Sequence, residues 1–527
     1  MGKRFALSIS SGLILGLSWV EITGLFPFVF VALIPFLILE DDILKKNLSS
    51  AKVYVHAFII FSIFNAVTTW WIYHASPAGA FMAFIFGAAL VAFPFWFFHL
   101  TRKFIGNKEG YIAFVINILA FEWLDYNWSL SHPWLPFGNA FAGFPDIVQW
   151  YEHTGVGGGS LWILLVNLIV FFAWKKFVSE KTIISIKKHI LTVLILLIIP
   201  ISISYLILNR VDLGENNPTI GVVVSQPNVD PYQKFDGNLT ALDQTKNMLK
   251  VTEKSIDENT RLIITPETAF PFSLEESMIQ YSDEVQLSKI FLKKYPKVNL
   301  LTGASTHAYF DKENSPASKK IDEGGFYESY NSTLLINQSD SIQIYHKMKL
   351  VLGVEVLPFQ FITKPLESIF DLGGTVGTLG TEKAPKNFKI GNAVVAPTIC
   401  YESIYGEFMG EFCVKGANII SVSTNDAWWY DTPGYKQLLA YTQLRAIENR
   451  KWIARSANTG ISCFINPRGE IVKKTKWEEA TSIGMDVPLM EGTTFYARNG
   501  DFISRIALFI ASLLLLLTFV RRIKNKK

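Results

Sequence analysis

The sequence is poor in cysteine. Its 527 residues include three cysteines, Cys400, Cys413 and Cys463, which are too few for a disulfide scaffold and lack the spacing of metal ligands. Cys413 and Cys463 could pair in an oxidising compartment, but two unpaired buried thiols are the favoured interpretation. The histidines on apolar segments (His56, His74 and His99) also lack metal-ligand spacing. We therefore expect no metal site.

A strong excess of charge is also missing. The formal net charge is +4 at pH 7, which argues against a broad nucleic-acid-binding surface, so no nucleic-acid partner is expected. The glycine-rich run Gly155–Gly159 lacks the Lys-Ser/Thr pair of a phosphate-binding loop and follows no strand. We interpret this run as a loop ahead of an apolar segment, and we expect no cofactor.

Long apolar runs, in contrast, are abundant. Hydrophobic residues make up 50% of the chain, the mean hydropathy is +0.26, and a helix needs about 20 apolar residues to cross the hydrocarbon core. The first run is followed by no small-x-small cleavage site, so it is predicted to be a retained span and not a signal peptide. The eight candidate spans are Phe5–Val20, Ile22–Leu39, Val53–Ile72, Gly79–Leu100, Tyr111–Leu124, Ser160–Phe177, Ile190–Leu208 and Ile503–Val520.

Basic residues occupy every second loop between these segments. They precede the first segment, follow the last and lie in the second, fourth and sixth loops, whereas the other short loops and the stretch 123–159 carry none. Lys and Arg collect in short loops on the cytoplasmic side of a membrane. The pattern therefore predicts that both termini lie inside and that the block between the seventh and eighth spans lies outside.

That block, from about Asn209 to Gly500, has the composition of a folded domain outside the membrane. Its short apolar runs alternate with helical stretches, which is typical of an α/β layered domain. The expected strands are Ile220–Val224, Leu262–Ile264, Val298–Leu301, Ser332–Ile336, Ala393–Ile399, Ile419–Val422 and Ile461–Ile465. The expected helices include Ala241–Ile256, Glu275–Lys294 and Gln437–Asn449.

Three residues of this block could form a thiol site for acyl transfer. Cys400 ends an apolar run, and Glu267 and Lys347 each follow a strand-like run. A thiol attacks as its thiolate, so it needs a base, which Glu267 can supply, or a positive field, which Lys347 can supply. Lys347 could also stabilise the oxyanion that forms on a carbonyl, together with backbone N–H groups after Cys400.

The three residues and their contexts resemble the nitrilase superfamily, whose catalytic trio is Glu, Lys and Cys in that chain order. The matching elements are Pro266-Glu267-Thr268-Ala269, Tyr345-x-Lys347 and Cys400-Tyr401-Glu402. With the membrane pattern, the closer resemblance is to the bacterial apolipoprotein N-acyltransferase family. The further motifs that carry this resemblance are Gln226-Pro227-Asn228, Thr424-Asn425-Asp426, Asn458-Thr459-Gly460 and Pro133-Trp134.

The family resemblance implies an architecture and a location. Its members have eight spans, with an αββα nitrilase-like sandwich inserted before the last span and facing the periplasm. We therefore expect a membrane domain at residues 1–208, a catalytic domain at 209–500, and a last span with a basic tail at 501–527. The location implied is the bacterial inner membrane.

The resemblance also implies roles for individual residues. Glu267 would be the general base, Lys347 the electrostatic stabiliser, and Cys400 the nucleophile that carries the acyl group as a thioester. Lys349 competes for the lysine role, but the spacing of Lys347 to Tyr345 and Glu355 favours Lys347. The stretch Leu350–Glu355 keeps the family spacing with a lost proline and a shifted glycine, and a phenylalanine stands where the family usually has tryptophan. The supporting positions are Glu355, Tyr401, Glu402, Pro358, Phe235 and Asn425.

The implied reaction is a ping-pong acyl transfer. A glycerophospholipid would acylate Cys400, and the α-amine of an apolipoprotein's N-terminal S-diacylglyceryl-cysteine would take the acyl group. The expected partners are the phospholipid acyl donor, the diacylglyceryl apolipoprotein acceptor and the membrane bilayer, and the expected state is a monomer. The alternative is a membrane-tethered carbon–nitrogen hydrolase with water as acceptor, which the trio alone does not distinguish. Retention of the trio disfavours a non-catalytic scaffold, and spans that are nearly free of charge disfavour a transporter.

Overall fold

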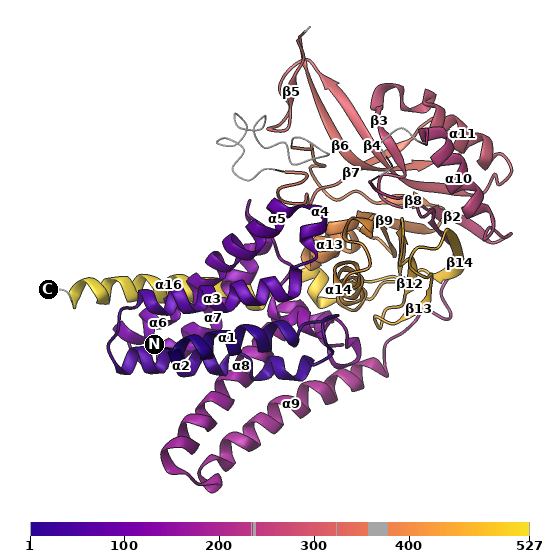
Figure 1. Ribbon diagram of the computed structural model, residues 1–527. Coiled ribbons are helices and arrows are strands. Elements are labelled where there is room, and N and C mark those ends of the chain that lie inside the picture. Colours follow the sequence, from indigo (N-terminus) through magenta and orange to yellow (C-terminus); the bar gives the residue numbers. More distant parts are fainter. Residues whose placement is uncertain (1, 233, 235–238, 323, 357–377, 526–527) are drawn as a thin grey trace. The chain divides into compact units, whose positions relative to one another are not determined.

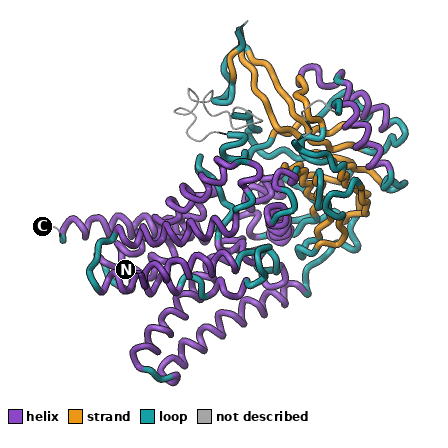
Figure 2. The backbone as a smooth tube through the Cα atoms, in the orientation of Figure 1, coloured by secondary structure: helices purple, strands orange, loops and turns teal. Residues whose placement is uncertain are grey.

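The chain forms two compact units, shown in the computed structural model of Figure 1. The helical unit comprises Met1–Arg210 and Asn499–Lys527, and the α/β unit comprises Val211–Arg498. The structure describes all residues except 1, 233, 235–238, 323, 357–377 and 526–527. Strands lie in the α/β unit, and the helical unit is built of helices and loops (Figure 2).

Among the described residues, five helices of the helical unit are long and apolar enough to cross a membrane. They span Ala51–Thr69, Gly79–Phe104, Tyr151–Glu180, Ile183–Leu208 and Phe502–Lys524. Only 6% of the apolar window of Ile183–Leu208 is buried within the protein, which suits a helix that is surrounded by hydrocarbon. The helices of this unit are α1 (Gly2–Leu17), α2 (Ile34–Lys45), α3 (Ala51–Thr69), α4 (Ile72–Ala75), α5 (Pro77–Met82), α6 (Ala88–Phe104), α7 (Asn107–Tyr126), α8 (Tyr151–Glu180), α9 (Lys187–Leu208) and α16 (Phe502–Lys524).

Two sequence predictions for this unit are wrong in detail. Ile22–Leu39 is not one helix, because a turn with Gly24 at φ +73° and a 3-10 helix at Phe26–Phe30 precede α2. The run Gly155–Gly159 is not a loop but lies inside α8, with a kink at Gly155. A Cβ on Gly159 would lie 1.8 Å from the hydroxyl of Tyr151, so close packing within the unit accounts for a glycine there.

The described part of the α/β unit contains two sheets. The first has the strand order β14-β1-β2-β4-β6-β5, with β3 beside β4 and β7 beside β6, and the second has the order β13-β12-β11-β10-β9-β8. The strands of the first sheet are β1 (Thr219–Gln226), β2 (Thr260–Ile264), β3 (Phe270–Glu275), β4 (Asn299–Phe310), β5 (Lys319–Lys320), β6 (Phe326–Ile336), β7 (Gln343–His346) and β14 (Thr481–Pro488). Those of the second are β8 (Phe388–Ile390), β9 (Ala393–Ile399), β10 (Ile419–Thr424), β11 (Ile453–Ala457), β12 (Cys463–Ile465) and β13 (Ile471–Lys474).

The two sheets lie face to face between outer helices. Hydroxyl groups join the sheets, since Ser423 of β10 donates to the carbonyl of Thr265 at 2.8 Å and Ser456 of β11 to that of Ser225 at 2.6 Å. Helices α10 (Ala241–Glu253) and α11 (Asp283–Leu292) cover the first sheet, and α13 (Gly406–Val414) and α14 (Pro433–Asn449) accompany the second. This αββα arrangement is the nitrilase-like sandwich that the sequence predicts.

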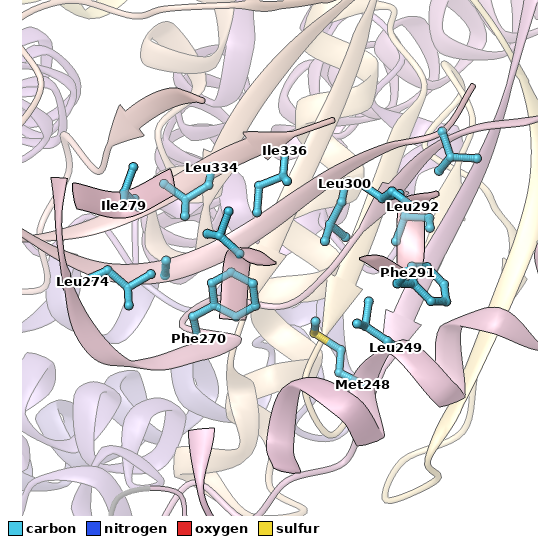
Figure 3. Packing of buried hydrophobic residues seen from close by; sticks show 14 of the residues in the cluster. Met248, Leu249, Phe270, Leu274, Ile279, Phe291, Leu292, Leu300, Leu334 and Ile336 are labelled. Carbon is cyan, nitrogen blue, oxygen red and sulfur yellow. The ribbon is translucent and has the colours of Figure 1, made fainter. Parts of the chain in front are cut away.

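A continuous apolar core fixes the first sheet against its helices (Figure 3). Met248 and Leu249 of α10 and Phe291 of α11 face Phe270 of β3 and Leu334 of β6. Burial of each such side chain contributes about 1.5–3 kcal/mol to the stability of the fold. This core therefore holds in place the sheet edge that carries the polar site.

The helix predicted over Glu275–Lys294 is interrupted in the structure. A 3-10 helix covers Glu276–Tyr281, and α11 begins at Asp283 after Ser282, whose φ and ψ of −64° and 145° are extended. The first residue of the predicted helix, Glu275, instead ends strand β3. Hydrophobic periodicity does not show such a break, but Ser282 and Asp283 are residue types favoured at helix starts and were the available signal.

Candidate active site

Parallel strands bring three polar segments to one edge of the two sheets. Strands β9 and β10 run parallel with Ile399 beside Ser423, so Cys400 follows β9 next to Thr424. Glu267 follows β2, which runs parallel to β1 and β4 in the other sheet. Carboxyl ends of parallel strands are where α/β proteins place their sites.

Lys347 lies at the centre of this edge. Its Nζ donates to Glu267 Oε1 and to Glu355 Oε1, each at 2.9 Å. Its own backbone N–H donates to the carbonyl of Asn331 at 2.8 Å, which fixes the residue directly after β7. The side chain is 1% exposed, so the ammonium depends on these two carboxylates for its charge balance.

Asn331 of β6 ties the two carboxylates together. Its Nδ2 donates to Glu267 Oε1 at 2.7 Å and to Glu355 Oε1 at 3.0 Å. Glu355 Oε2 in turn accepts from the backbone N–H of Val351 at 2.8 Å. The shifted glycine, Gly353, has φ +80°, a conformation that glycine adopts without strain, and the turn around it returns Glu355 to Lys347.

Glu402 joins the segment of Lys347 to the segment of Cys400. Its Oε1 accepts from the hydroxyl of Tyr345 at 2.8 Å and from the backbone N–H of Met348 at 2.6 Å. Its Oε2 accepts from the backbone N–H of Ile399 at 2.8 Å. Glu402 therefore holds the residues on both sides of Lys347 beside the strand end that carries Cys400.

Cys400 sits at a strained turn between β9 and a 3-10 helix, Cys400–Ile404. Its φ is +49°, and Thr268, the residue after Glu267, also has φ +49°. Left-handed φ at residues with a Cβ costs about 1–3 kcal/mol and is concentrated at functional sites. The turn leaves the Cys400 thiol beside the Glu267 carboxylate, whose pKa it helps to lower.

The charges of the site keep the thiol neutral at rest. Burial raises the pKa of Cys400 well above its ordinary value and the negative charge of Glu267 adds to this, whereas Lys347 opposes it. Burial alone would raise the pKa of Glu267, but the ammonium of Lys347 and the amide of Asn331 hold it below its usual range. Burial would likewise lower the pKa of Lys347, and its two carboxylate partners keep it well above its usual range. Glu267 is therefore a carboxylate that can take the thiol proton.

The remaining predicted residues lie at different distances from the Glu267–Lys347 pair, and some lie outside the described part of the chain. Lys349 lies 5.1 Å from the ring centre of Tyr405 and 5.7 Å from that of Phe408, not on Glu267. Tyr401 packs edge-on against Tyr405 at 5.5 Å. Asn425 is 2% exposed and accepts a hydrogen bond from Asn458. Phe235 and Pro358 lie outside the described residues, and Cys413 and Cys463 are buried free thiols.

Sequence reasoning missed two residues that shape the site. Asn331 gives no spacing signal, because a single amide within a strand resembles any other polar strand residue. Gly303 of β4 lies so close to the Glu267 turn that a Cβ on it would be 2.4 Å from the Pro266 carbonyl oxygen and 2.7 Å from the Glu267 Cα. A glycine inside a strand is the available signal for such a close approach.

Comparison with known proteins covers both units. Residues 226–493 match the carbon–nitrogen hydrolase family, and residues 11–169 match the apolipoprotein N-acyltransferase N-terminal domain. The apolipoprotein N-acyltransferase of Chlorobaculum tepidum is 30% identical over 99% of this chain and 98% of its own length. That of Geobacter metallireducens is 24% identical over 99% of this chain and 96% of its own.

Among solved structures, an amidase from Nesterenkonia sp. aligns with 53% of this chain and 92% of its own at 15% identity, with a TM-score of 0.36. The two family matches and the 30% identity to the Chlorobaculum protein extend over nearly the whole sequence, so they assign both units to one family. The chain belongs to the apolipoprotein N-acyltransferase family.

Proposed function

We propose that the chain transfers an acyl chain from a glycerophospholipid through Cys400 to the α-amine of an apolipoprotein's N-terminal S-diacylglyceryl-cysteine. In the first half-reaction, Glu267 takes the proton of the thiol as the sulfur attacks the ester carbonyl carbon. The C–S bond forms, and the oxyanion is stabilised by the Lys347 ammonium and by backbone N–H groups after Cys400. The acyl C–O bond then breaks, the glycerol oxygen takes the proton from Glu267, and a lysophospholipid leaves.

In the second half-reaction the neutral α-amine attacks the thioester carbonyl. Glu267 takes a proton from the attacking nitrogen, the C–N bond forms, and the C–S bond breaks. The departing thiolate recovers the proton from Glu267, so the site returns to its starting state with an amide as product. The hydrogen bond between Lys347 and Glu267 and the closeness of Glu267 to the Cys400 thiol carry this proposal, since one carboxylate within reach of the sulfur can serve both halves.

An aromatic cluster formed by Tyr232, Trp428 and Tyr430 is proposed to receive the lipid chains. Trp428 follows the site segment Thr424–Asp426, and Tyr232 contacts both Trp428 and Tyr430, with ring centres at 5.4 and 5.7 Å. Tyr232 and Tyr430 are 43% and 52% exposed. Exposed amphipathic rings of this kind suit the interface between water and acyl chains.

The membrane arrangement is part of the proposal. Alternate basic loops support eight spans with both termini in the cytoplasm and the α/β unit in the periplasm, in the bacterial inner membrane. Two of the eight proposed spans have short helices, since α1 has 16 residues and α2 has 12. Each of these helices would therefore cross the membrane together with the chain segments next to it. We propose that the protein acts as a monomer, because the described acid, lysine and thiol all come from one chain.

The variant Cys400→Ser tests the proposed function. We expect it to lose apolipoprotein N-acylation by at least about a thousandfold, because a hydroxyl is a far weaker nucleophile than a thiolate in this setting. Expression and membrane insertion should be unchanged, and quantitative mass spectrometry of a lipoprotein N-terminus measures the loss. Undiminished N-acylation would overturn the proposal, and release of free fatty acid without amide would point to the hydrolase alternative.

A further inference from the structure

Thr424 is a second neighbour of the nucleophile sulfur. It is the last residue of β10, and the parallel register that pairs Ser423 with Ile399 places it beside Cys400. Thr424 is fully buried, and its side chain lies close enough to Cys400 to favour the thiolate. Glu267 and Thr424 therefore both act on the same sulfur.

The Thr424 hydroxyl also has a charged partner. It donates a hydrogen bond to Oδ1 of Asp426, and Oδ2 of Asp426 accepts from Nη2 of Arg455. Asp426 and Arg455 are both fully buried. Arg455 donates further to the carbonyl of Ile461 at 2.5 Å. The ion pair thus fixes the position of the Thr424 hydroxyl.

A hydroxyl has a single hydrogen, so Thr424 can serve one of these two acceptors at a time. While Cys400 is a thiol, its sulfur is a weak acceptor, and the hydroxyl donates to the Asp426 carboxylate. Once Glu267 has taken the thiol proton, the thiolate is a charged acceptor at the same hydroxyl. Asp426 keeps its bond to Arg455, so it can release the hydroxyl hydrogen without being left unpaired.

We propose that Thr424 is a catalytic hydroxyl that turns its hydrogen from Asp426 to the Cys400 thiolate in each half-reaction, and that Asp426 and Arg455 are positioning residues. No covalent bond at Thr424 changes, because its O–H only rotates about the C–O bond. The thiol proton passes to Glu267 as before. The proposal deepens the function proposed above and rests on Cys400 being the nucleophile.

The test compares Thr424→Val, which removes the hydroxyl at nearly constant volume, with Thr424→Ser, which keeps it. The full-length protein in detergent is treated with iodoacetamide over a range of pH, and mass spectrometry follows the peptide that contains Cys400. The charged groups acting on this sulfur are Glu267, Lys347 and Asp426, and all remain in both variants. Thr398→Val is the matched control, because Thr398 of β9 is also fully buried and donates to a backbone carbonyl at 2.6 Å.

We expect Thr424→Val to move the midpoint of Cys400 alkylation upward by about one pH unit and to slow thioester formation about tenfold or more, since it removes a hydrogen bond to a charged group. Thr424→Ser and Thr398→Val should stay near the wild-type midpoint. An unshifted midpoint in Thr424→Val, or an equal shift in Thr398→Val, would overturn the proposal. If Thr424→Val folds poorly, Thr424→Ala gives the same readout without an added methyl group.

The alkylation midpoint separates this proposal from the proposed function. It reports on the sulfur and its hydrogen bonds even if no acyl transfer takes place. If acyl transfer proves not to take place but the midpoint shifts, the proposed role of Thr424 at the sulfur still stands. If acyl transfer is normal but the midpoint does not shift, only the role of Thr424 is refuted.

Discussion

The helical unit and the α/β unit each bury a cluster of charged side chains. In the helical unit, Arg102 of α6 donates to Glu40 and, at 2.6 Å, to Asp41 of α2. Lys175 of α8 approaches Asp41 at 3.0 Å, and His99 lies 2.7 Å from Glu40. We call these residues the helix-end cluster. In the α/β unit, Glu267 and Glu355 both bind the ammonium of Lys347 beside the Cys400 thiol.

The two clusters differ in their charge balance and in their backbones. In the helix-end cluster the cations match the carboxylates and all residues lie in regular helices, so the cluster joins helices. In the site, the charged groups lie beside a thiol, and Cys400 and Thr268 are held at positive φ. The comparison teaches that burial of charge alone does not mark a reactive site; a charged cluster beside a nucleophile on a strained turn does.

Removing the central cation of each cluster gives the largest contrast. Lys347→Met should lower kcat for N-acylation by about a hundredfold to a thousandfold, because the oxyanion loses its ammonium. Arg102→Met should cost about 3–5 kcal/mol of stability, since it leaves buried carboxylates unpaired, while each folded molecule keeps nearly normal kcat. Activity per folded molecule and thermal unfolding in detergent measure the two effects. Equal losses of kcat in both variants would break the comparison.

Glu402 differs from the carboxylates of both clusters, because the groups that donate hydrogen bonds to it are neutral. Burial raises the pKa of Glu402 to about 7, against the opposing hydrogen bonds of the Met348 and Ile399 N–H groups. A raised pKa means that the folded state binds more protons than the unfolded state between about pH 4.5 and 7. The free energy of unfolding of the wild type should therefore fall by up to about 3 kcal/mol relative to that of Glu402→Gln as pH rises through this window. Thermal unfolding of both proteins against pH measures it, and parallel curves would refute the assignment.

The backbone of the site can be perturbed without touching any charge. Gly303→Ala would push a Cβ into the Glu267 turn, 2.4 Å from the Pro266 carbonyl. Since small misplacements of a catalytic group slow reactions strongly, we expect N-acylation to fall between about tenfold and a hundredfold. Gly221→Ala is the matched control, because its Cβ would lie 2.3 Å from the Asn259 carbonyl, in another loop. A comparable loss of kcat in both variants would indicate general strain instead.

The smallest expected effect concerns the competing lysine. Lys349 rests on aromatic rings, where such a contact contributes about 0.5–1 kcal/mol. Lys349→Gln should therefore leave kcat within about threefold of wild type, in contrast to Lys347→Met. A steady-state assay of both variants decides between the two lysines, and a large loss in Lys349→Gln would reassign the role.

The sequence predicted much of the α/β unit because local patterns specify it. Strand β9 spans Ala393–Ile399, as expected, since an apolar run that ends at Cys400 has few other interpretations. Ile22–Leu39 was predicted wrongly as one helix, because mean hydropathy does not register the turn at Gly24. Asn331 could not be foreseen, because its importance comes from two carboxylates brought to it from distant parts of the chain. Motif resemblance proposed Glu267, Lys347 and Cys400, and the fold brings these side chains together.

The most direct measurement is the mass of the Cys400 peptide after the purified protein has been incubated with phospholipid. The account predicts one added acyl chain on that peptide and its loss, with formation of an amide, when a peptide bearing an N-terminal S-diacylglyceryl-cysteine is supplied. A Cys400 peptide that never gains acyl mass while N-acylated product accumulates would contradict it.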